Sequence, residues 1–269
     1  MKRMATDVGG TFTDIVWVDE DTGTVHMDKA PTTPKDVVQG VLAATRKTNV
    51  PAAEIGQFVH GSTVATNALI VMGGGKTGLL ATRGFRDAIE IRRINRPDDH
   101  IYNMFWRKPA PLIRRALRRE VTERIRFTGE VITPVDRADV VAAVEEFKRD
   151  GVETIAICFL HAYANPAHEQ EVREIIRGLW PEVYVSMSHE VAREIREYER
   201  VSSTAIDAYV TKPVVSYLRR LQRAFKDDLG VANDPLIANS TGGVSTIDAI
   251  ERAPIQMLAS CPAGGAIGA

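Results

Sequence analysis

The sequence predicts an α/β protein whose sheet begins as an antiparallel meander. Three apolar stretches of strand length, at residues 2–8, 13–18 and 24–29, are joined by turn signals at Gly9-Gly10 and at residues 21–23. Beyond them, segments with helical periodicity alternate with further short apolar runs. We therefore expect a mixed sheet with helices packed on its faces, because parallel strands need crossover connections that are usually helical.

The elements after the meander are expected in an alternating order. Apolar residues recur at helical spacing over residues 33–48, after a Thr-Pro start, and Phe58-Val59 lies in a strand that ends at His60-Gly61. A helix at about 63–72 follows. Residues 73–75, all glycine, end this helix before a buried strand at 77–82.

A second α/β unit is expected after a long excursion. Residues 95–116 are rich in Pro, Arg and aromatic residues without a clear period, which is typical of a functional or disordered surface segment. We expect strands near 119–126, 130–133, 152–160 and 183–187, with helices at about 136–149, 165–178 and 198–226. After a candidate linker at 230–235, strand signals occur at 236–240, 242–246 and 255–259, and a loop begins at Cys261.

The composition is that of an ordinary globular protein. The 269 residues are 44% hydrophobic and 26% charged, enough for one large or two moderate domains. The 34 Lys and Arg balance the 35 Asp and Glu, so we expect neither a nucleic-acid partner nor attachment to an anionic membrane. No window supplies the roughly 18 apolar residues of a membrane helix. With only two cysteines, one of them in an apolar run, we expect a reduced, cytoplasmic protein.

The strongest local signal is DVGGTFTD at residues 7–14, in the tight turn between the first two strands. Gly9 and Gly10 let backbone N–H groups approach an anion, and Thr11 and Thr13 add hydroxyl donors. Asp7 can face the same anion only with a hard cation such as Mg²⁺ between them. The alternative interpretation is a simple β-turn with Asp and Thr as turn formers.

A second signal is HGSTVATN at residues 60–67, between a strand and a helix. Its hydroxyls and the free N–H groups of a helix N-terminus favour an anion or a polarised carbonyl oxygen. The alternative is an ordinary N-cap by Ser62 or Thr63. In a fold that begins with a meander, this strand should end at the same sheet edge as the hairpin, so both loops could line one cleft.

The hairpin resembles the first phosphate loop of the superfamily of actin, heat-shock ATPases and sugar kinases, in which a D-x-G-G-T hairpin in the first of two lobes binds nucleotide phosphates. The whole chain resembles the hydantoinase A/5-oxoprolinase family, which includes ATP-using subunits of some ketone carboxylases. The resembling blocks are DVGGTFTDIV at 7–16, HGSTVATNALI at 60–70, GLLATRGFRDAIEIRR at 78–93, NRPD at 95–98, AICFLHAYANPAHE at 156–169, SHEVAREIREYERVSSTAIDAYV at 188–210 and STGGVS at 240–245.

This resemblance implies a ribonuclease H-like (actin-like ATPase) fold that uses ATP and Mg²⁺. It implies ATP-dependent activation of a carbonyl or cyclic amide substrate, as in the ring-opening of hydantoins or 5-oxoproline, together with a hydantoinase B-like subunit or domain in a hetero-oligomer. The ATP-using subunit of a ketone carboxylase, which activates a ketone or bicarbonate, and a non-catalytic nucleotide-binding lobe are the alternatives.

The resemblance also implies roles for particular residues. The candidate catalytic residues are Asp7, Thr63 and Asn67, and Asp7 is also the candidate metal ligand. The candidate cofactor-binding residues are Gly9, Gly10, Thr11, Thr13 and Asp14. The candidate substrate-binding residues are His60, Ser62, Thr66 and Arg92.

Two domains are expected from the resemblance, an N-terminal domain at 1–185 and the start of an ATPase domain at 186–269. Cys261 stands where the family usually has the first glycine of S-G-P-A-G-G. No second phosphate loop follows, so the chain is expected to be a fragment or one piece of a split enzyme.

Other charged residues leave alternatives open. His189 lacks the second histidine of a zinc-protease motif, and His161 and His168 favour helix capping or solvation over metal binding. Two arginine-rich stretches could each be solvated surface, or could instead face an anion or a partner subunit. They comprise Arg92, Arg93, Asn95 and Arg96, and Arg193, Arg196, Tyr198, Glu199 and Arg200.

Overall fold

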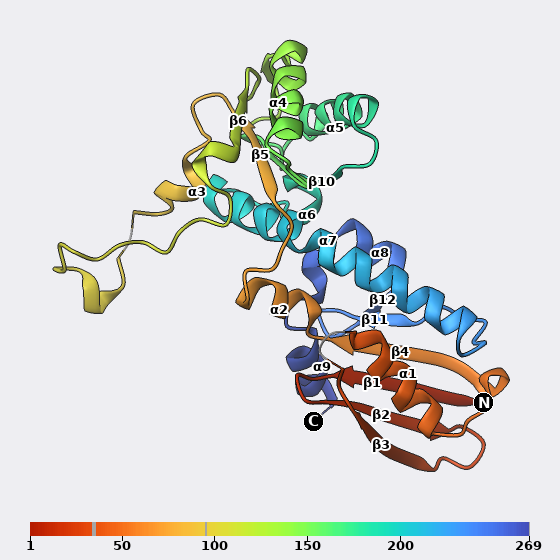
Figure 1. Ribbon diagram of the computed structural model, residues 1–269. Helices are drawn as coiled ribbons and strands as arrows, with labels where there is room; N and C mark the ends of the chain where they lie inside the picture. Colours follow the sequence, from red (N-terminus) through yellow and green to blue (C-terminus); the bar gives the residue numbers. More distant parts are fainter. Residues whose placement is uncertain (34–35, 95, 269) are drawn as a thin grey trace. The chain divides into compact units, whose positions relative to one another are not determined.

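The computed structural model describes residues 1–33, 36–94 and 96–268, and the chain forms two compact units (Figure 1). The first unit comprises residues 1–74 and 213–269, and the second comprises residues 75–212. One long helix, α7 (Glu197–Asp227), contributes residues to both units. No helix of the described residues is both long and apolar enough to cross a membrane.

The first unit contains a six-stranded sheet with the strand order β12-β11-β4-β1-β2-β3. As predicted, β1, β2 and β3 form an antiparallel meander, while β4 pairs in parallel with β1 and β11 pairs in parallel with β4. The sheet is therefore mixed. Its strands are β1 (Lys2–Val8), β2 (Phe12–Asp19), β3 (Val25–Pro31), β4 (Ile55–Ser62), β11 (Leu236–Ala238) and β12 (Val244–Ser245).

Side-chain alternation gives this sheet a covered face and an open face. Along β1, Met4, Thr6 and Val8 are buried, whereas Ala5 and Asp7 are exposed. The buried face packs against α1 (Val37–Lys47) and against the part of α7 that follows the unit boundary. Helix α1 turns its apolar stripe inward, as its periodicity predicts. The predicted start of this helix includes residues 34 and 35, which lie outside the described residues.

The remaining elements of the first unit surround the strand ends. They are η1 (Ala52–Glu54), α2 (Val64–Ile70), α8 (Ile247–Arg252), η4 (Pro254–Met257) and α9 (Ser260–Gly268). The predicted strand at 255–259 is wrong, because a short helical turn with a proline at its start occupies this stretch. The predicted loop from Cys261 is also wrong, because these residues form α9. The candidate linker at 230–235 joins α7 to β11 within this unit.

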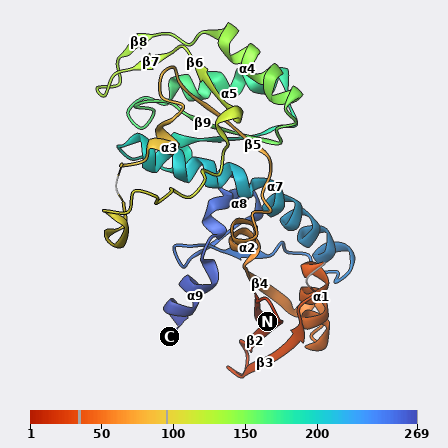
Figure 2. The ribbon, with the colours of Figure 1, turned by 60° about the vertical axis from the view of Figure 1, so that its left-hand side comes forward.

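The second unit contains a parallel sheet with the strand order β10-β9-β5-β6 (Figures 1 and 2). Its strands are β5 (Thr77–Thr82), β6 (Arg118–Val121), β9 (Thr154–Cys158) and β10 (Tyr184–Met187). Helices α4 (Arg137–Arg149) and α5 (Ala167–Leu179) cover one face, and α3 (Ala88–Ile91) and the start of α7 cover the other. Because both faces are covered, β5 and β9 are buried throughout, as their continuous apolar runs predict.

Residues 96–116 of the predicted surface excursion form an irregular segment of the second unit, seen in yellow in Figure 1. It contains two short helical turns, η2 (Asp98–His100) and η3 (Arg115–Leu117). Tyr102, Met104 and Phe105 are 95%, 86% and 91% exposed. The hairpin β7 (Arg124–Ile125) and β8 (Val131–Thr133) and the short helix α6 (Ser188–Val191) complete this unit.

Candidate functional site

The hairpin and the end of β4 meet at one edge of the first sheet, as the sequence predicts. In the parallel pairing of β1 with β4, Asp7 is the partner of Gly61 and Val8 is the partner of Ser62. The Thr63 hydroxyl donates to the carbonyl oxygen of Val8 at 3.3 Å. The two loops singled out in the sequence are therefore neighbours in space.

Two hydrogen bonds close the hairpin, one between backbone groups and one from a side-chain hydroxyl. The Gly9 amide donates to the carbonyl oxygen of Phe12 at 3.0 Å, and the Thr32 hydroxyl donates to the carbonyl oxygen of Gly9 at 3.0 Å. A side chain at Gly9 would lie 3.2 Å from that Phe12 oxygen, so closure of the turn itself favours glycine there. Gly10 differs, because a Cβ built on it meets no atom within 4 Å and its φ is not positive.

Two carboxylates face each other across the hairpin strands. Asp7 is the register partner of Asp14, and both are exposed on the open face of the sheet. Neither has a Lys or Arg within ion-pair distance among the described residues. Directly opposed like charges repel, and Lys29, the register partner of Asp14 on β3, is the cationic neighbour on the other side of Asp14. A cation that bridges the pair to an anion would relieve the repulsion.

Helix α9 supplies a contact that the sequence analysis did not anticipate. The Cys261 thiol, in its first turn, donates to Asp7 Oδ1 at 2.7 Å. Burial raises the pKa of the Cys261 thiol to about 12, and the hydrogen bond to Asp7 adds to the rise, so the thiol stays a proton donor. Gly61 lies beneath the same carboxylate, since a Cβ there would be 3.2 Å from Asp7 Oδ1.

The start of α2 presents polar groups of different accessibility. Asn67 is exposed and donates to Thr63 Oγ1 at 3.2 Å, while Thr66 Oγ1 accepts from the Ala259 amide at 3.4 Å. Ser62 is 1% exposed, and its oxygen accepts from the Val64 amide at 3.3 Å. Thr63 is the N-cap residue of α2 and makes no capping bond with its side chain. The groups accessible to a ligand are the half-buried Thr63 and Thr66 and the exposed Asn67.

Two predicted site residues point into the core. His60 is 0% exposed, with Nδ1 at 2.9 Å from Thr6 Oγ1 and Nε2 at 2.6 Å from the Tyr217 hydroxyl. Burial lowers the pKa of His60 to about 3, so the ring is neutral. Thr13 is likewise 0% exposed, 3.1 Å from the hydroxyl of Thr32. In this conformation both side chains lie under the two loops, where they bond to core residues and not to a ligand.

Arg92 belongs to the second unit, where it follows α3 and donates to the carbonyl oxygen of Pro109 at 2.6 Å. Asn95 of the same stretch lies outside the described residues. The second unit also buries two polar residues for which solvation was one of the sequence-based alternatives. His168 is 4% exposed with Nδ1 2.7 Å from Glu123 Oε2, and Arg200 is 1% exposed with bonds to Ser188 and Phe159. The solvated alternative is therefore wrong for both residues.

No group of three or more His, Cys, Asp or Glu side chains within the described ranges is arranged to hold a metal ion.

Comparisons with known proteins match most of the chain to a single family. Residues 3–179 match the model of the hydantoinase/oxoprolinase N-terminal region, and residues 200–269 match the hydantoinase/oxoprolinase model. An uncharacterised protein of Methanocaldococcus jannaschii is 38% identical over 268 residues, covering 98% of this chain and 39% of that protein. The caprolactamase alpha subunit of Pseudomonas jessenii is 35% identical over 97% of this chain and 38% of the subunit.

Solved structures agree with the sequence comparisons. The ATP-dependent caprolactamase of Pseudomonas jessenii matches with a TM-score of 0.86 and 34% identity, over 97% of this chain and 39% of that chain. Nucleotide-free acetone carboxylase matches with a TM-score of 0.84 and 27% identity, over 99% of this chain and 39% of that chain. These matches confirm the predicted actin-like ATPase fold. The chain spans about two fifths of the length of these relatives.

Proposed function

Because the chain belongs to the hydantoinase/oxoprolinase family, we propose that it supplies the first phosphate-binding hairpin of an ATP-dependent enzyme that activates a carbonyl or cyclic amide substrate. The observation that carries this proposal is the open surroundings of Gly10 at the hairpin tip. Neither a positive φ nor a crowded neighbour requires glycine at this exposed turn position. A glycine at this place in the motif leaves the neighbouring backbone N–H groups open to close approach by a phosphate.

The acidic pair fits a nucleotide-bound magnesium ion. Mg²⁺ keeps several waters and is usually held by one or two carboxylates together with phosphate oxygens. Asp7 and Asp14 are the exposed carboxylates beside the hairpin tip, and neither forms an ion pair with a described residue. We assign Asp7, with Asp14 beside it, to the cation, and the backbone of Gly9 to Thr11 to the phosphates. The ion neutralises the charge of the phosphates when it is bound.

The proposed reaction uses ATP to overcome amide resonance. The amide oxygen of the substrate attacks the γ-phosphorus, the bond to the β–γ bridging oxygen breaks, and ADP leaves. Water then adds to the activated carbon, the ring C–N bond opens and inorganic phosphate is released. The balance is cyclic amide, ATP and water giving an open-chain amino acid, ADP and phosphate. Thr63, Asn67 and Thr66 stand at the site to position the substrate, while His60, Ser62 and Thr13 hold the loops.

Partners follow from the same proposal. The caprolactamase relative is named as a subunit, and this chain covers about two fifths of it. We propose that the nucleotide site is completed by a second lobe, and that ring opening needs a hydantoinase B-like partner in a hetero-oligomer. The ATP-using subunit of a ketone carboxylase is the second candidate function, favoured by the likeness to acetone carboxylase.

The test is a matched pair of glycine substitutions. Gly10→Val should weaken ATP binding at least about tenfold, because a branched side chain blocks access of phosphate to the backbone N–H groups. Gly178→Val is the control, since Gly178 is an exposed glycine on α5 whose Cβ also meets nothing within 4 Å. Titration of both variants with ATP and Mg²⁺ decides the outcome. Equal ATP affinity in the two folded variants would remove the hairpin from nucleotide binding.

A further inference from the structure

A cavity of about 600 Å³ lies in the second unit, between the end of α3 and the excursion. This volume is within the range of cavities that hold organic ligands. Three cationic side chains line it, those of Arg96, Arg107 and Lys108. Its apolar lining includes Trp106 and residues 109–111. The cavity therefore combines positive charge with an aromatic ring.

The three cations keep donors that the protein does not use. The Arg107 side chain has no ion pair or hydrogen bond within the described part of the chain. Arg96 donates through Nη1 alone, to two backbone carbonyl oxygens of the excursion at 3.1 and 3.4 Å. Lys108 Nζ donates to the carbonyl oxygen of Glu90 at 3.2 Å, and two further donors of this ammonium group remain. A bound anion can accept from all three side chains.

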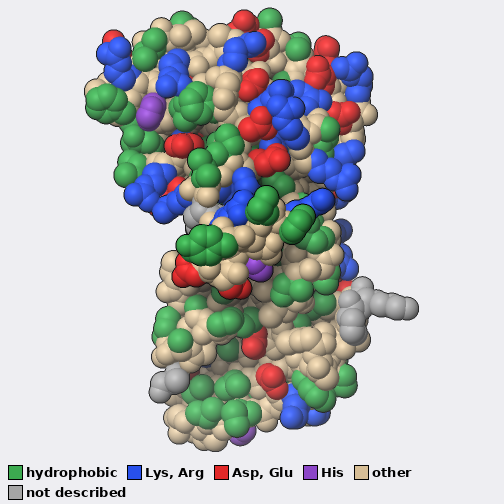
Figure 3. Space-filling model, turned by 90° about the vertical axis from the view of Figure 1, so that its left-hand side faces the viewer, with side chains coloured by type: hydrophobic (Ala, Val, Ile, Leu, Met, Phe, Trp, Pro, Cys, Tyr) green, Lys and Arg blue, Asp and Glu red, His purple; other side chains and the backbone are tan. Residues whose placement is uncertain are grey.

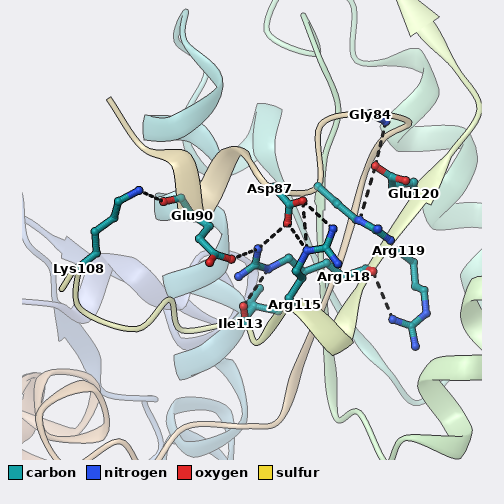
Figure 4. Close-up of polar contacts among 10 residues, drawn as sticks. Gly84, Asp87, Glu90, Lys108, Ile113, Arg115, Arg118, Arg119 and Glu120 are labelled. Atoms are coloured by element: carbon teal, nitrogen blue, oxygen red, sulfur yellow. Dashed lines mark hydrogen bonds and ion pairs between the residues drawn. The ribbon is translucent and has the colours of Figure 1, made fainter. Parts of the chain in front are cut away.

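The carboxylate among the lining residues belongs to Glu90, and it is already neutralised, as Figure 4 shows. Glu90 Oε2 lies 2.9 Å from Nη1 of Arg118, which is 1% exposed. Arg118 also pairs with Asp87, which has a second partner in Arg115 at 3.0 Å. Two carboxylates and two guanidinium groups thus balance within this cluster. The positive charge of the cavity is left without a counter-charge from its own lining.

Trp106 supplies the aromatic surface. Its ring is half-buried and stacks with the ring of His100, with 6.1 Å between centroids and 28° between planes. His100 lies 3.6 Å from Asp99, and both Asp98 and Asp99 lie outside the cavity lining. The acidic residues of the excursion therefore do not offset the cations of the cavity.

The backbone around the cavity is held in place. Ile94, which lines the cavity, has a φ of 60°, and a β-branched residue rarely adopts this left-handed conformation. Its amide donates to the carbonyl oxygen of Ile91 at 3.3 Å. Arg92 Nη2 donates to the carbonyl oxygen of Pro109 at 2.6 Å, which ties the excursion to the end of α3. A site fixed in this way loses less conformational freedom when a ligand binds.

We propose that this cavity is a nucleotide-binding site of the second unit, separate from the hairpin of the first unit. The phosphates lie among Arg96, Arg107 and Lys108, and the base stacks on Trp106. One arginine suffices for a single carboxylate, whereas three cations with free donors match a group that carries several negative charges. Stacking on an aromatic side chain is available to every base. This inference does not depend on the proposed function.

The test follows the fluorescence of Trp106 in a chain that carries Trp17→Phe and Trp180→Phe, which leaves Trp106 as its single tryptophan. The probes are ADP, adenosine and pyrophosphate, all with EDTA, because the proposed hairpin site needs Mg²⁺. We expect ADP to quench the fluorescence until the site is saturated. ADP should bind at least about tenfold more tightly than adenosine, which lacks phosphates, and than pyrophosphate, which lacks a ring.

Matched arginine variants locate the binding. Arg107→Gln should weaken ADP binding at least about fivefold, because it removes a charged donor. Arg149→Gln should leave it unchanged, since Arg149 is an exposed arginine on α4 without an ion pair among the described residues. If the single-tryptophan chain does not fold, ligand-detected NMR with the same probes on chains that keep all three tryptophans replaces the fluorescence.

Four results would overturn the proposal. They are no detectable binding of ADP, equal binding of ADP and adenosine, equal binding of ADP and pyrophosphate, and the same loss in Arg149→Gln as in Arg107→Gln. The variant Gly10→Val separates the two sites. It should leave the response of Trp106 to ADP unchanged, and loss of that response would assign the binding to the hairpin.

Discussion

At the level of single residues, alternation along the strands decides which polar groups of the first unit can meet a ligand. Asp7 and Asp14 share the open face, where Gly61 leaves room beside the carboxylate. Thr13 and His60 lie on the covered face, against α1 and α7. Residues that are adjacent in the motif therefore lie on opposite faces of the sheet. Those on the open face are accessible to a ligand, and those on the covered face pack the sheet against its helices.

Burial of neutral His60 makes the stability of the first unit depend on pH. The pKa of His60 is about 3 in the folded chain and about 6.5 when unfolded, so the unfolded state binds the proton between these values. The free energy of unfolding is therefore unaffected by His60 above pH 6.5. Below pH 6.5 it falls by about 1.4 kcal/mol for each pH unit, because the unfolded chain gains the proton. We expect urea midpoints to decline from pH 7 to pH 5, and to decline less steeply in His60→Asn. Parallel slopes in the two proteins would show that His60 is not titrating.

At the level of elements, close approach of a strand to a helix organises the second unit. Gly78 lies on β5 beneath the ring of Phe147 on α4, and a Cβ there would be 2.7 Å from the ring. The strand is buried throughout, so the ring has little free space into which to move. Glycine in this strand is thus explained by packing.

Gly78→Ala should lower the free energy of unfolding by about 1–3 kcal/mol, because the added methyl group overpacks the core. Phe147→Leu in the same chain should restore part of this loss, so that the double variant is more stable than the sum of the single changes predicts. Chemical denaturation of all three variants measures the coupling. Gly178→Ala, on the exposed face of α5, is the control and should not destabilise. Additive losses would mean that Gly78 and Phe147 do not press on each other.

At the level of the whole molecule, apolar side chains interrupt the charged surface, as Figure 3 shows for one face. The excursion carries the most exposed of them, with Tyr102, Met104 and Phe105 within four residues. Clustered exposed aromatic residues favour association, because burial removes apolar area from water.

We therefore expect the 269-residue chain to sediment faster as its concentration rises. The double change Tyr102→Ser with Phe105→Ser should weaken this dependence. Phe127→Ser removes a single exposed aromatic residue, 68% exposed beside the β7–β8 hairpin, and should have little effect. Analytical ultracentrifugation distinguishes the variants. Monomeric behaviour of the natural chain at every concentration would contradict this expectation.

The division into domains at 1–185 and 186–269 stays a prediction. The structure adds that the chain forms compact units at 1–74 with 213–269 and at 75–212, so α7 carries sequence from one unit into the other.

The sequence by itself determined the features that depend on near neighbours. The meander, the hairpin at Gly9-Gly10 and the bounds of β5 follow from periodicity of two and from turn residues, both of which are read over a few positions. The shared edge of β1 and β4 also followed, because element order restricts how such strands can pair.

Only the tertiary structure decided the surroundings of individual side chains. His60 meets Tyr217 across 157 residues of sequence, and Cys261 meets Asp7 across 254. No local pattern specifies such contacts, because burial and hydrogen bonding depend on which distant elements pack together. The sequence therefore predicted which residues could form hydrogen bonds. The packing of distant elements determined which of them meet.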